Sequence, residues 1–153
     1  MSQHTDFLAK PLDEIERRIY YDANMFIRKC VGEIVNNNSS KGVASITGHL
    51  ALGEAFGTAR RKGQEELESL LGVIEHLGSY LRVVSHDGIN DHLALVLEIF
   101  PRLAMSDAIH LATALSNDCE ILRSSDGDLY GLDKHKLERL CSECGSNKLL
   151  ISS

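Results

Sequence analysis

Short β-prone runs alternate with longer helical segments along the chain, and this alternation constrains the fold more than any other feature. Between the runs, apolar residues recur at the three- and four-residue spacing of helices that cover a core. This pattern predicts an α/β fold, with a central, mostly parallel sheet of about four to five short strands flanked by helices. The predicted strands are 19–21, 81–84, 119–122 and a candidate last strand at 148–151.

Polar, glycine and proline residues delimit the predicted helices. Gly63 follows one helix as its stop, Pro101 ends another, and Ser106 resembles the N-cap of a third. The polar run from Asn36 to Ser40 predicts a loop. The helices expected from this reading cover 23–35, 47–62, 64–80, 90–100, 106–115 and 134–141.

The size and uniformity of the chain predict one domain. It has 153 residues, with no repeat or linker, so we expect a single domain over 1–153, in which 133–153 add a C-terminal helix, a CxxC turn and the last strand. No stretch approaches the ~20 apolar residues of a membrane span, and the N-terminus does not resemble a signal peptide. Four cysteines make no disulfide framework, which favours a cytoplasmic location.

The charge balance argues against a broad basic surface. There are 16 basic and 22 acidic residues, a net charge of −6, and only 5% of the residues are aromatic. Proteins that bind nucleic acids usually neutralise phosphates with Lys and Arg or stack bases on aromatic rings. Such binding would here require metal ions to supply positive charge.

Acidic residues follow two of the predicted strands. Asp22 comes directly after 19–21, and Asp126 lies just beyond 119–122. Ligands of parallel sheets bind beyond the carboxyl ends of the strands, so both acids lie where a site is expected. Each also fits a simpler role in a turn or helix cap.

Two further acids lie within predicted helices. Asp107 is in a first helical turn, where the helix dipole alone would favour it. Glu54 lies in the small, apolar stretch 50–56. A buried charge there is costly unless it is paired or bound to a metal, so Glu54 is the acid that physical reasoning singles out.

The sequences around these acids resemble the four motifs of PIN-domain nucleases, in the same order and at similar spacing. The resemblance spans 19 to about 132. The opening motif, an apolar strand followed by Asp, a small residue and Asn, resembles YYDANMFI at 20–27. The others resemble LGEAF at 52–56, SDAIHLATAL at 106–115 and ILRSSDGDL at 121–129.

This resemblance implies a metal-dependent endoribonuclease, a hydrolase of RNA phosphodiester bonds. Oxygen ligands suit Mg²⁺ or Mn²⁺, and converging carboxylates imply a bound cation because they otherwise repel one another. The residues implied to bind metal and act in catalysis are Asp22, Glu54, Asp107 and Asp126, with Asp128 as a further metal ligand and Asn24 as a weaker candidate that positions water or phosphate.

The resemblance also suggests partners and leaves alternatives open. Many family members are toxins of toxin–antitoxin pairs and others process RNA, so an antitoxin protein and a homodimer are expected partners besides RNA, and a membrane is not. One alternative is a catalytically silent PIN-like module that binds RNA or a protein. An aspartyl-phosphate enzyme fits less well, because such enzymes carry paired acids in the first motif.

Two other features carry competing readings. Arg60, Arg61 and Lys62 end a predicted helix, where they suit the helix C-terminus as well as contacts to an RNA backbone. His110 follows Asp107 on the same predicted helix, and a packing or hydrogen-bonding role is favoured for it over catalysis.

Cys141 and Cys144 form a CxxC pair that resembles half of a zinc ribbon. A structural Zn²⁺ needs four ligands, and His135 is the one candidate for a third, unless a dimer pairs two such turns. Unliganded thiols are therefore favoured over Zn²⁺, with a disulfide or redox pair as the remaining reading. Cys30 and Cys119 lie in apolar segments and are expected in the core.

Overall fold

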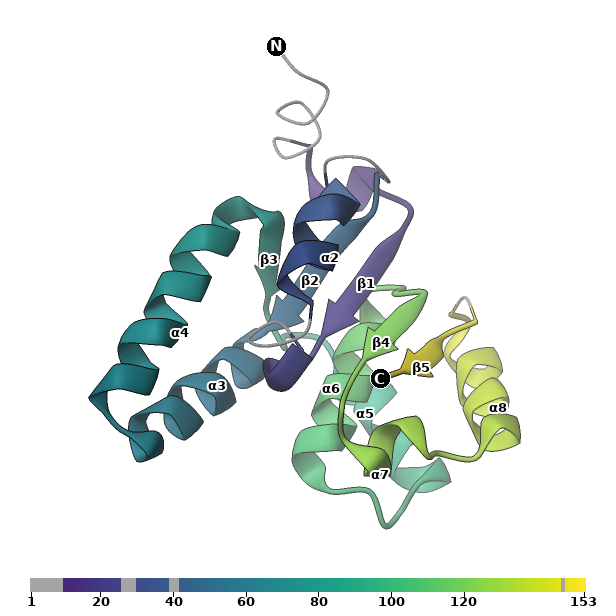
Figure 1. Cartoon of the computed structure of the whole chain (residues 1–153). Coiled ribbons are helices and arrows are strands. Elements are labelled where there is room, and N and C mark those ends of the chain that lie inside the picture. Colours follow the sequence, from purple (N-terminus) through teal and green to yellow (C-terminus); the bar gives the residue numbers. More distant parts are fainter. Residues whose placement is uncertain (1–9, 26–29, 39–41, 147) are drawn as a thin grey trace.

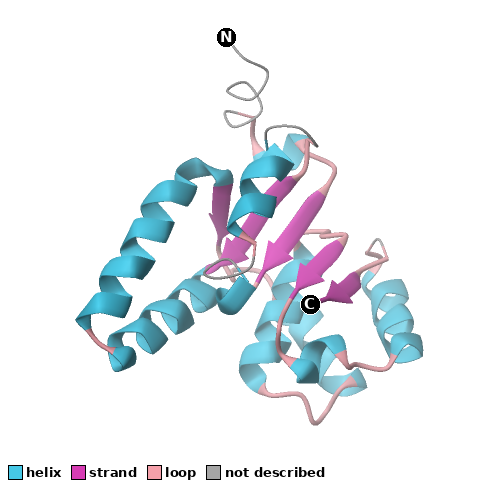
Figure 2. Ribbon diagram, viewed as in Figure 1, coloured by secondary structure: helices cyan, strands magenta, loops and turns pink. Residues whose placement is uncertain are grey.

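Five parallel strands form one sheet at the centre of the molecule (Figures 1 and 2). This computed structural model describes residues 10–25, 30–38, 42–146 and 148–153. The strand order β3-β2-β1-β4-β5 and the parallel pairing confirm the predicted α/β class. The strands are β1 (Arg18–Tyr21), β2 (Ala44–Gly48), β3 (Leu81–Val84), β4 (Ile121–Arg123) and β5 (Leu150–Ser152).

Helices cover both faces of the sheet. On one face Tyr20, Ile46 and Leu122 pack into a core with α5, α6 and α8, which lie behind the sheet in Figure 1. On the other, Ile19 and Tyr21 share a second core with α2, α3 and α4. The helices described are η1 (Leu12–Glu14), α2 (Val31–Asn36), α3 (His49–Lys62), α4 (Gln64–Leu77), η4 (Gly78–Tyr80), α5 (Asn90–Ile99), α6 (Met105–Ser116), α7 (Gly127–Tyr130) and α8 (Lys134–Cys144). None of these described helices is long and apolar enough to span a lipid bilayer.

Strand β1 is the point at which the chain changes the side of the sheet on which it adds strands. From β1 the chain builds outward through β2 to β3, and then returns to place β4 and β5 on the other side. Parallel sheets bind ligands at such a reversal, beyond the carboxyl ends of the two central strands. Here the backbone N–H of Asp22 donates to the Arg123 carbonyl at 3.1 Å, which joins the end of β1 to the end of β4.

Strand β2 was not predicted, and the helix expected from Thr47 begins instead at His49. All of β2 is buried, so its sequence lacks the alternation of a half-exposed strand. Its polar side chains are satisfied internally, as Thr47 shows by donating its hydroxyl to the Tyr21 carbonyl at 2.7 Å.

The loop predicted from Asn36 to Ser40 is wrong for the asparagines, while Ser39 and Ser40 lie outside the described residues. Asn36 ends α2, and the next two side chains are buried. Asn37 Nδ2 donates to the Tyr21 hydroxyl at 2.8 Å. Asn38 Nδ2 donates to two backbone carbonyls, including that of Tyr80 at 2.9 Å. Internal hydrogen bonds therefore replace the solvation of the two amide nitrogens, whereas the buried Oδ1 of Asn38 has no partner among the described residues.

Two smaller expectations also change. Helix α6 begins at Met105, with Ala104 at the N-cap position and no side-chain cap, so the predicted capping role of Ser106 is wrong. Helix α8 runs on through Cys144, which places the CxxC pair in its last turns and not in a turn after the helix. The predicted strand at 81–84 is confirmed, and the helix expected over 23–35 includes residues 26–29, which are outside the described part.

Candidate metal centre

Asp22 is held rigidly where β1 ends. Its side chain is only 8% exposed. The Ser124 hydroxyl donates to Asp22 Oδ2 at 2.6 Å, and the Met25 backbone N–H donates to Oδ1 at 3.3 Å. Burial raises the pKa of Asp22, while these two hydrogen bonds to the carboxylate oppose the rise.

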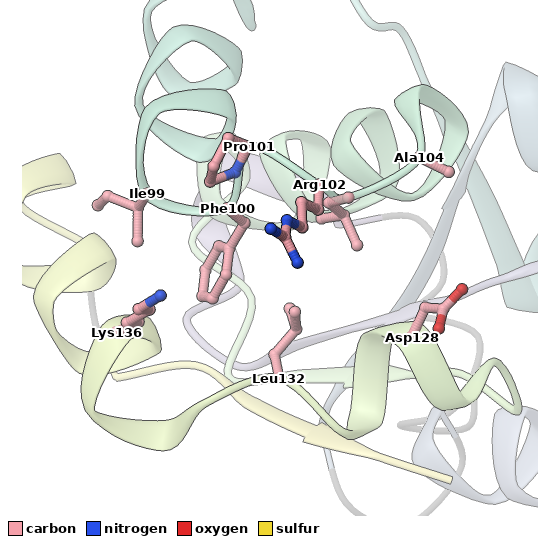
Figure 3. A pocket seen from close by; sticks show the side chains of 9 residues that line it. Ile99, Phe100, Pro101, Arg102, Ala104, Asp128, Leu132 and Lys136 are labelled. Carbon is pink, nitrogen blue, oxygen red and sulfur yellow. The ribbon is translucent and has the colours of Figure 1, made fainter.

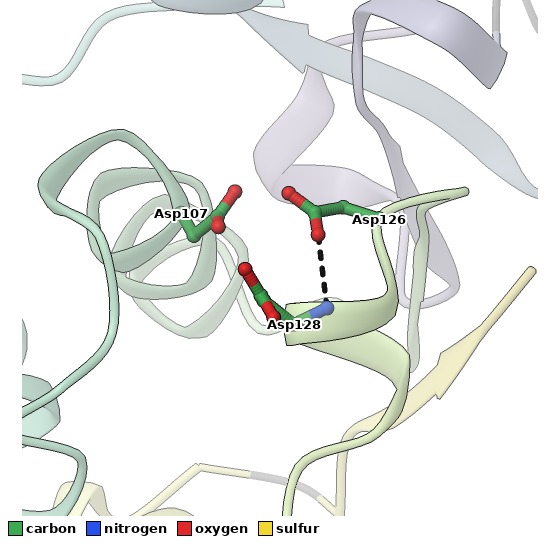
Figure 4. A group of neighbouring side chains, drawn as sticks. All are labelled: Asp107, Asp126 and Asp128. Carbon is green, nitrogen blue, oxygen red and sulfur yellow. Dashed lines mark hydrogen bonds between the residues drawn. The ribbon is translucent and has the colours of Figure 1, made fainter.

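Asp107, Asp126 and Asp128 converge on one point (Figure 4), where one ligand atom from each lies within 4.8 Å of the others. Asp107 comes from the first turn of α6 and is buried. Asp126 caps α7 by accepting a hydrogen bond from the Asp128 backbone N–H at 2.9 Å. The capping role and a ligand role are therefore compatible, because the cap occupies only one oxygen of Asp126.

The electrostatics of this group favour a cation. The pKa of Asp107 is raised to about 6, first by burial and next by the charge of Asp126 and a hydrogen bond with it. The charges of Asp128 and Glu54 add to the rise. A positive ion among these oxygens would favour the charged form of Asp107 and so oppose both the burial and the carboxylate repulsion that raise its pKa.

Glu54 lies beside this group, but it is not buried as expected. Helix α3 turns Ala51, Ala55 and Ala59 toward the sheet and leaves the Glu54 side chain 40% exposed. Glu54 Oε1 lies 2.6 Å from His110 Nε2. Glu54 is therefore paired, as its apolar helix required, but it is less buried than that argument assumed.

His110 has the hydrogen-bonding role expected of it. Its side chain is buried, and its Nδ1 lies 2.7 Å from the Tyr20 hydroxyl on β1. Both ring nitrogens are satisfied if Nε2–H donates to Glu54 and the Tyr20 hydroxyl donates to Nδ1. The imidazole thus links the sheet to the exposed carboxylate.

One cavity of about 150 Å³ collects most of the predicted site. Asp22, Glu54, Asp107 and Asp126 all line it, together with Asn24, so the structure brings these five side chains together. Asp128 does not line this cavity and joins the site only through the aspartate group of Figure 4.

Sequence reasoning missed the residues that support this cavity. Ser124 orients Asp22 and also accepts a hydrogen bond from the Asp126 backbone N–H at 3.0 Å, so it connects two of the acids. Thr58, one turn beyond Glu54, lines the cavity as well. The sequence signal for Ser124 is its place between β4 and Asp126, but a serine there also fits an ordinary turn.

The other candidates lie apart from the cavity. Arg60, Arg61 and Lys62 are exposed in the last turn of α3. Cys30 and Cys119 are buried free thiols, as expected.

The CxxC pair lacks the ligands of a zinc site in this structure. Cys141 is a buried free thiol and Cys144 is partly buried. Burial raises the pKa of Cys144, which favours its neutral thiol. Over the described ranges, no third His, Cys or carboxylate joins the pair closely enough to hold a metal.

A scan of the sequence against models of known protein families finds no match, and a search of curated proteins finds no similar sequence.

Proposed function

We propose that this protein is a PIN-type endoribonuclease that hydrolyses RNA phosphodiester bonds with Mg²⁺ or Mn²⁺. The observation that carries the proposal is the shared cavity of Asp22, Glu54, Asp107 and Asp126 at the carboxyl ends of β1 and β4. These are the four acids on which the resemblance to the family's motifs rests.

The donor set fits these cations. Every candidate ligand is a carboxylate, the oxygen donor that Mg²⁺ and Mn²⁺ prefer. Asp107, Asp126 and Asp128 would hold one ion between them, with Asp22 and Glu54 facing the same space. When bound, such an ion lowers the pKa of a coordinated water, neutralises phosphate charge and stabilises the leaving oxygen.

The protein itself supplies orientation. Ser124 fixes Asp22, and His110 fixes Glu54, so two carboxylates are held in place before any ligand arrives. Asn24 is exposed at the cavity, where its amide can donate a hydrogen bond to a phosphate oxygen. A protein with an acidic net charge could bind RNA in this way, because the metal ion would supply the positive charge at the scissile phosphate that a basic groove otherwise provides.

Cleavage of RNA by the purified protein, with Mg²⁺ or Mn²⁺ and with excess chelator, tests the proposal. Asp22→Asn and Asp107→Asn should each lower the rate at least about a hundredfold, because each removes a ligand charge. Asp118→Asn is the matched control, since Asp118 is exposed and lies away from the cavity. Activity that survives both substitutions and the chelator contradicts the mechanism.

One contact favours the alternative of a silent binding module. The Glu54 carboxylate already pairs with His110 at 2.6 Å, so it has a partner without a metal. Calorimetric titration with Mn²⁺ separates the two functions. A nuclease centre binds Mn²⁺ and loses that binding in Asp107→Asn, whereas a silent module shows no binding in either protein.

The biological setting of the activity is a second question. A toxin would copurify from its host with a small antitoxin that covers the acids with a basic side chain. Recovery of the protein without such a partner would favour a role in RNA processing.

A further inference from the structure

A second and larger pocket lies next to the aspartate group (Figure 3). Its volume is about 450 Å³, within the range of about 300–1,000 Å³ that is usual for small-molecule sites. It lies between the segment that joins α5 to α6 and the segment that joins α7 to α8.

The pocket combines an apolar wall with two cations. Phe100, Leu103 and Leu132 supply apolar surface. The guanidinium of Arg102 and the ammonium of Lys136 face the same space from different elements (Figure 3). Both cations are exposed, and within the described part of the chain neither side-chain cation forms a hydrogen bond or an ion pair, although the Asp133 carboxylate lies near enough for its pKa to be affected by the charge of Lys136. An unpaired Arg and Lys beside apolar surface suit an anion that carries a flat or apolar group.

Asp128 connects this pocket to the candidate metal centre. Its side chain lines the pocket and also belongs to the group with Asp107 and Asp126. A molecule bound in the pocket therefore borders the position at which a phosphate would be cut.

We propose that the pocket binds one nucleotide of the RNA strand, next to the nucleotide whose phosphate is cleaved. The base and sugar would lie against the apolar wall, and the phosphate would lie between Arg102 and Lys136. The identification of the ligand as part of an RNA strand rests on the proposed nuclease function. The pocket also gives a chain of net charge −6 a local place to hold a second phosphate.

Binding of adenosine 5′-monophosphate to the full-length protein, followed by NMR in the presence of EDTA, tests the pocket without the metal. The backbone amides of Arg102, Leu132 and Lys136 should shift, and adenosine without phosphate should bind more weakly. Arg102→Ala combined with Lys136→Ala should weaken binding roughly tenfold, because two charge-assisted contacts to the phosphate are lost. Arg17→Ala combined with Arg139→Ala is the matched control, which removes two exposed cations outside the pocket.

A short oligoribonucleotide in the same buffer should displace the mononucleotide, which distinguishes an RNA site from one for free nucleotides only. Equal affinity of wild type and the Arg102/Lys136 variant, or no shift at the pocket, overturns the proposal. A protein that binds the mononucleotide at this pocket but never cleaves RNA contradicts the nuclease function alone. A protein that cleaves RNA but leaves the pocket empty contradicts the nucleotide pocket alone.

Discussion

His110 Nε2 lies 2.6 Å from Glu54 Oε1, so a buried imidazole on α6 positions a partly exposed carboxylate on α3. The other ring nitrogen lies 2.7 Å from the Tyr20 hydroxyl. A hydroxyl on the central strand thereby determines which nitrogen of the imidazole faces the cavity. Carboxylates that bind metals are commonly held by hydrogen bonds from such neighbouring groups.

Replacement of His110 by Leu should weaken Mn²⁺ binding by about tenfold, because Glu54 loses the partner that orients it. Tyr20→Phe should have a smaller effect on Mn²⁺ and lower the free energy of unfolding by about 1–2 kcal/mol, since it leaves Nδ1 of His110 buried without a partner. Calorimetry and urea unfolding measure the two effects. Unchanged Mn²⁺ affinity in His110→Leu would show that His110 does not position Glu54 for the ion.

Ser124→Ala should destabilise the protein by about 1–3 kcal/mol, because the buried hydrogen bond from the Ser124 hydroxyl to Asp22 Oδ2 at 2.6 Å is lost. The same change leaves the Asp126 backbone N–H without its acceptor. Since the hydrogen bond from Ser124 lowers the pKa of Asp22, that pKa should rise further in the variant. Chemical denaturation and NMR titration of the Asp22 carboxyl carbon check both effects. Ser125→Ala, one position along, is the control.

Asp107 should make the metal-free protein less stable as the pH rises. Its pKa is about 6 in the folded protein and about 3.9 in an unfolded chain, so the folded state binds the proton more tightly. The stabilisation from this group is complete below pH 4 and is lost as the pH rises through 6. Asp107→Asn should therefore be more stable than wild type at pH 7.5, by on the order of 1 kcal/mol, and not at pH 4.

Urea unfolding in EDTA at both pH values measures this difference. Added Mn²⁺ should reverse it, because an ion that binds only the folded wild type stabilises it. An Asp107→Asn protein that gains no stability at the higher pH, relative to wild type, would contradict the raised pKa.

Gly48→Ala should destabilise the protein by about 1–3 kcal/mol through a clash and not through backbone strain. A Cβ at Gly48 would lie 2.5 Å from Cε1 of His86 and 3.0 Å from the Tyr20 hydroxyl. The clash would displace the imidazole whose Nε2 accepts the Leu50 backbone N–H at 2.9 Å, at the start of α3. Gly53→Ala is the matched control, because a Cβ there meets nothing within 4 Å. That control should gain about 0.5–1 kcal/mol in thermal or urea unfolding.

The helices and strands were predictable where apolar residues recur at a regular spacing or where a residue such as Gly or Pro ends the element. The amphipathic α4 and the strand β3 were found from such patterns, whereas the uniformly buried β2 was not. Asn37 and Asn38 led to a wrong loop prediction, because their amide nitrogens donate hydrogen bonds inside the protein in place of contacts to solvent. A single sequence does not show which polar groups find internal partners.

The acidic residues of the candidate site were predictable from the sequence, but the residues that hold them in place were not. Asp22, Glu54, Asp107 and Asp126 were chosen from their local sequences, and one cavity unites them. The roles of Ser124 and Tyr20 depend on neighbours 102 and 90 residues away, so no local pattern contains them. The exposure of Glu54 was likewise set by how α3 sits on the sheet.

The pairing of β4 with β1 also determines when the acidic cavity comes into existence. A nascent chain that has emerged only as far as α5 contains Asp22 and Glu54, but it lacks Asp107, Ser124 and Asp126. Contacts between such distant segments also cost the most loop entropy and tend to form late. Incomplete copies of the protein therefore contain no assembled carboxylate centre, and whatever chemistry it performs begins only after β4 has been synthesised and has docked beside β1.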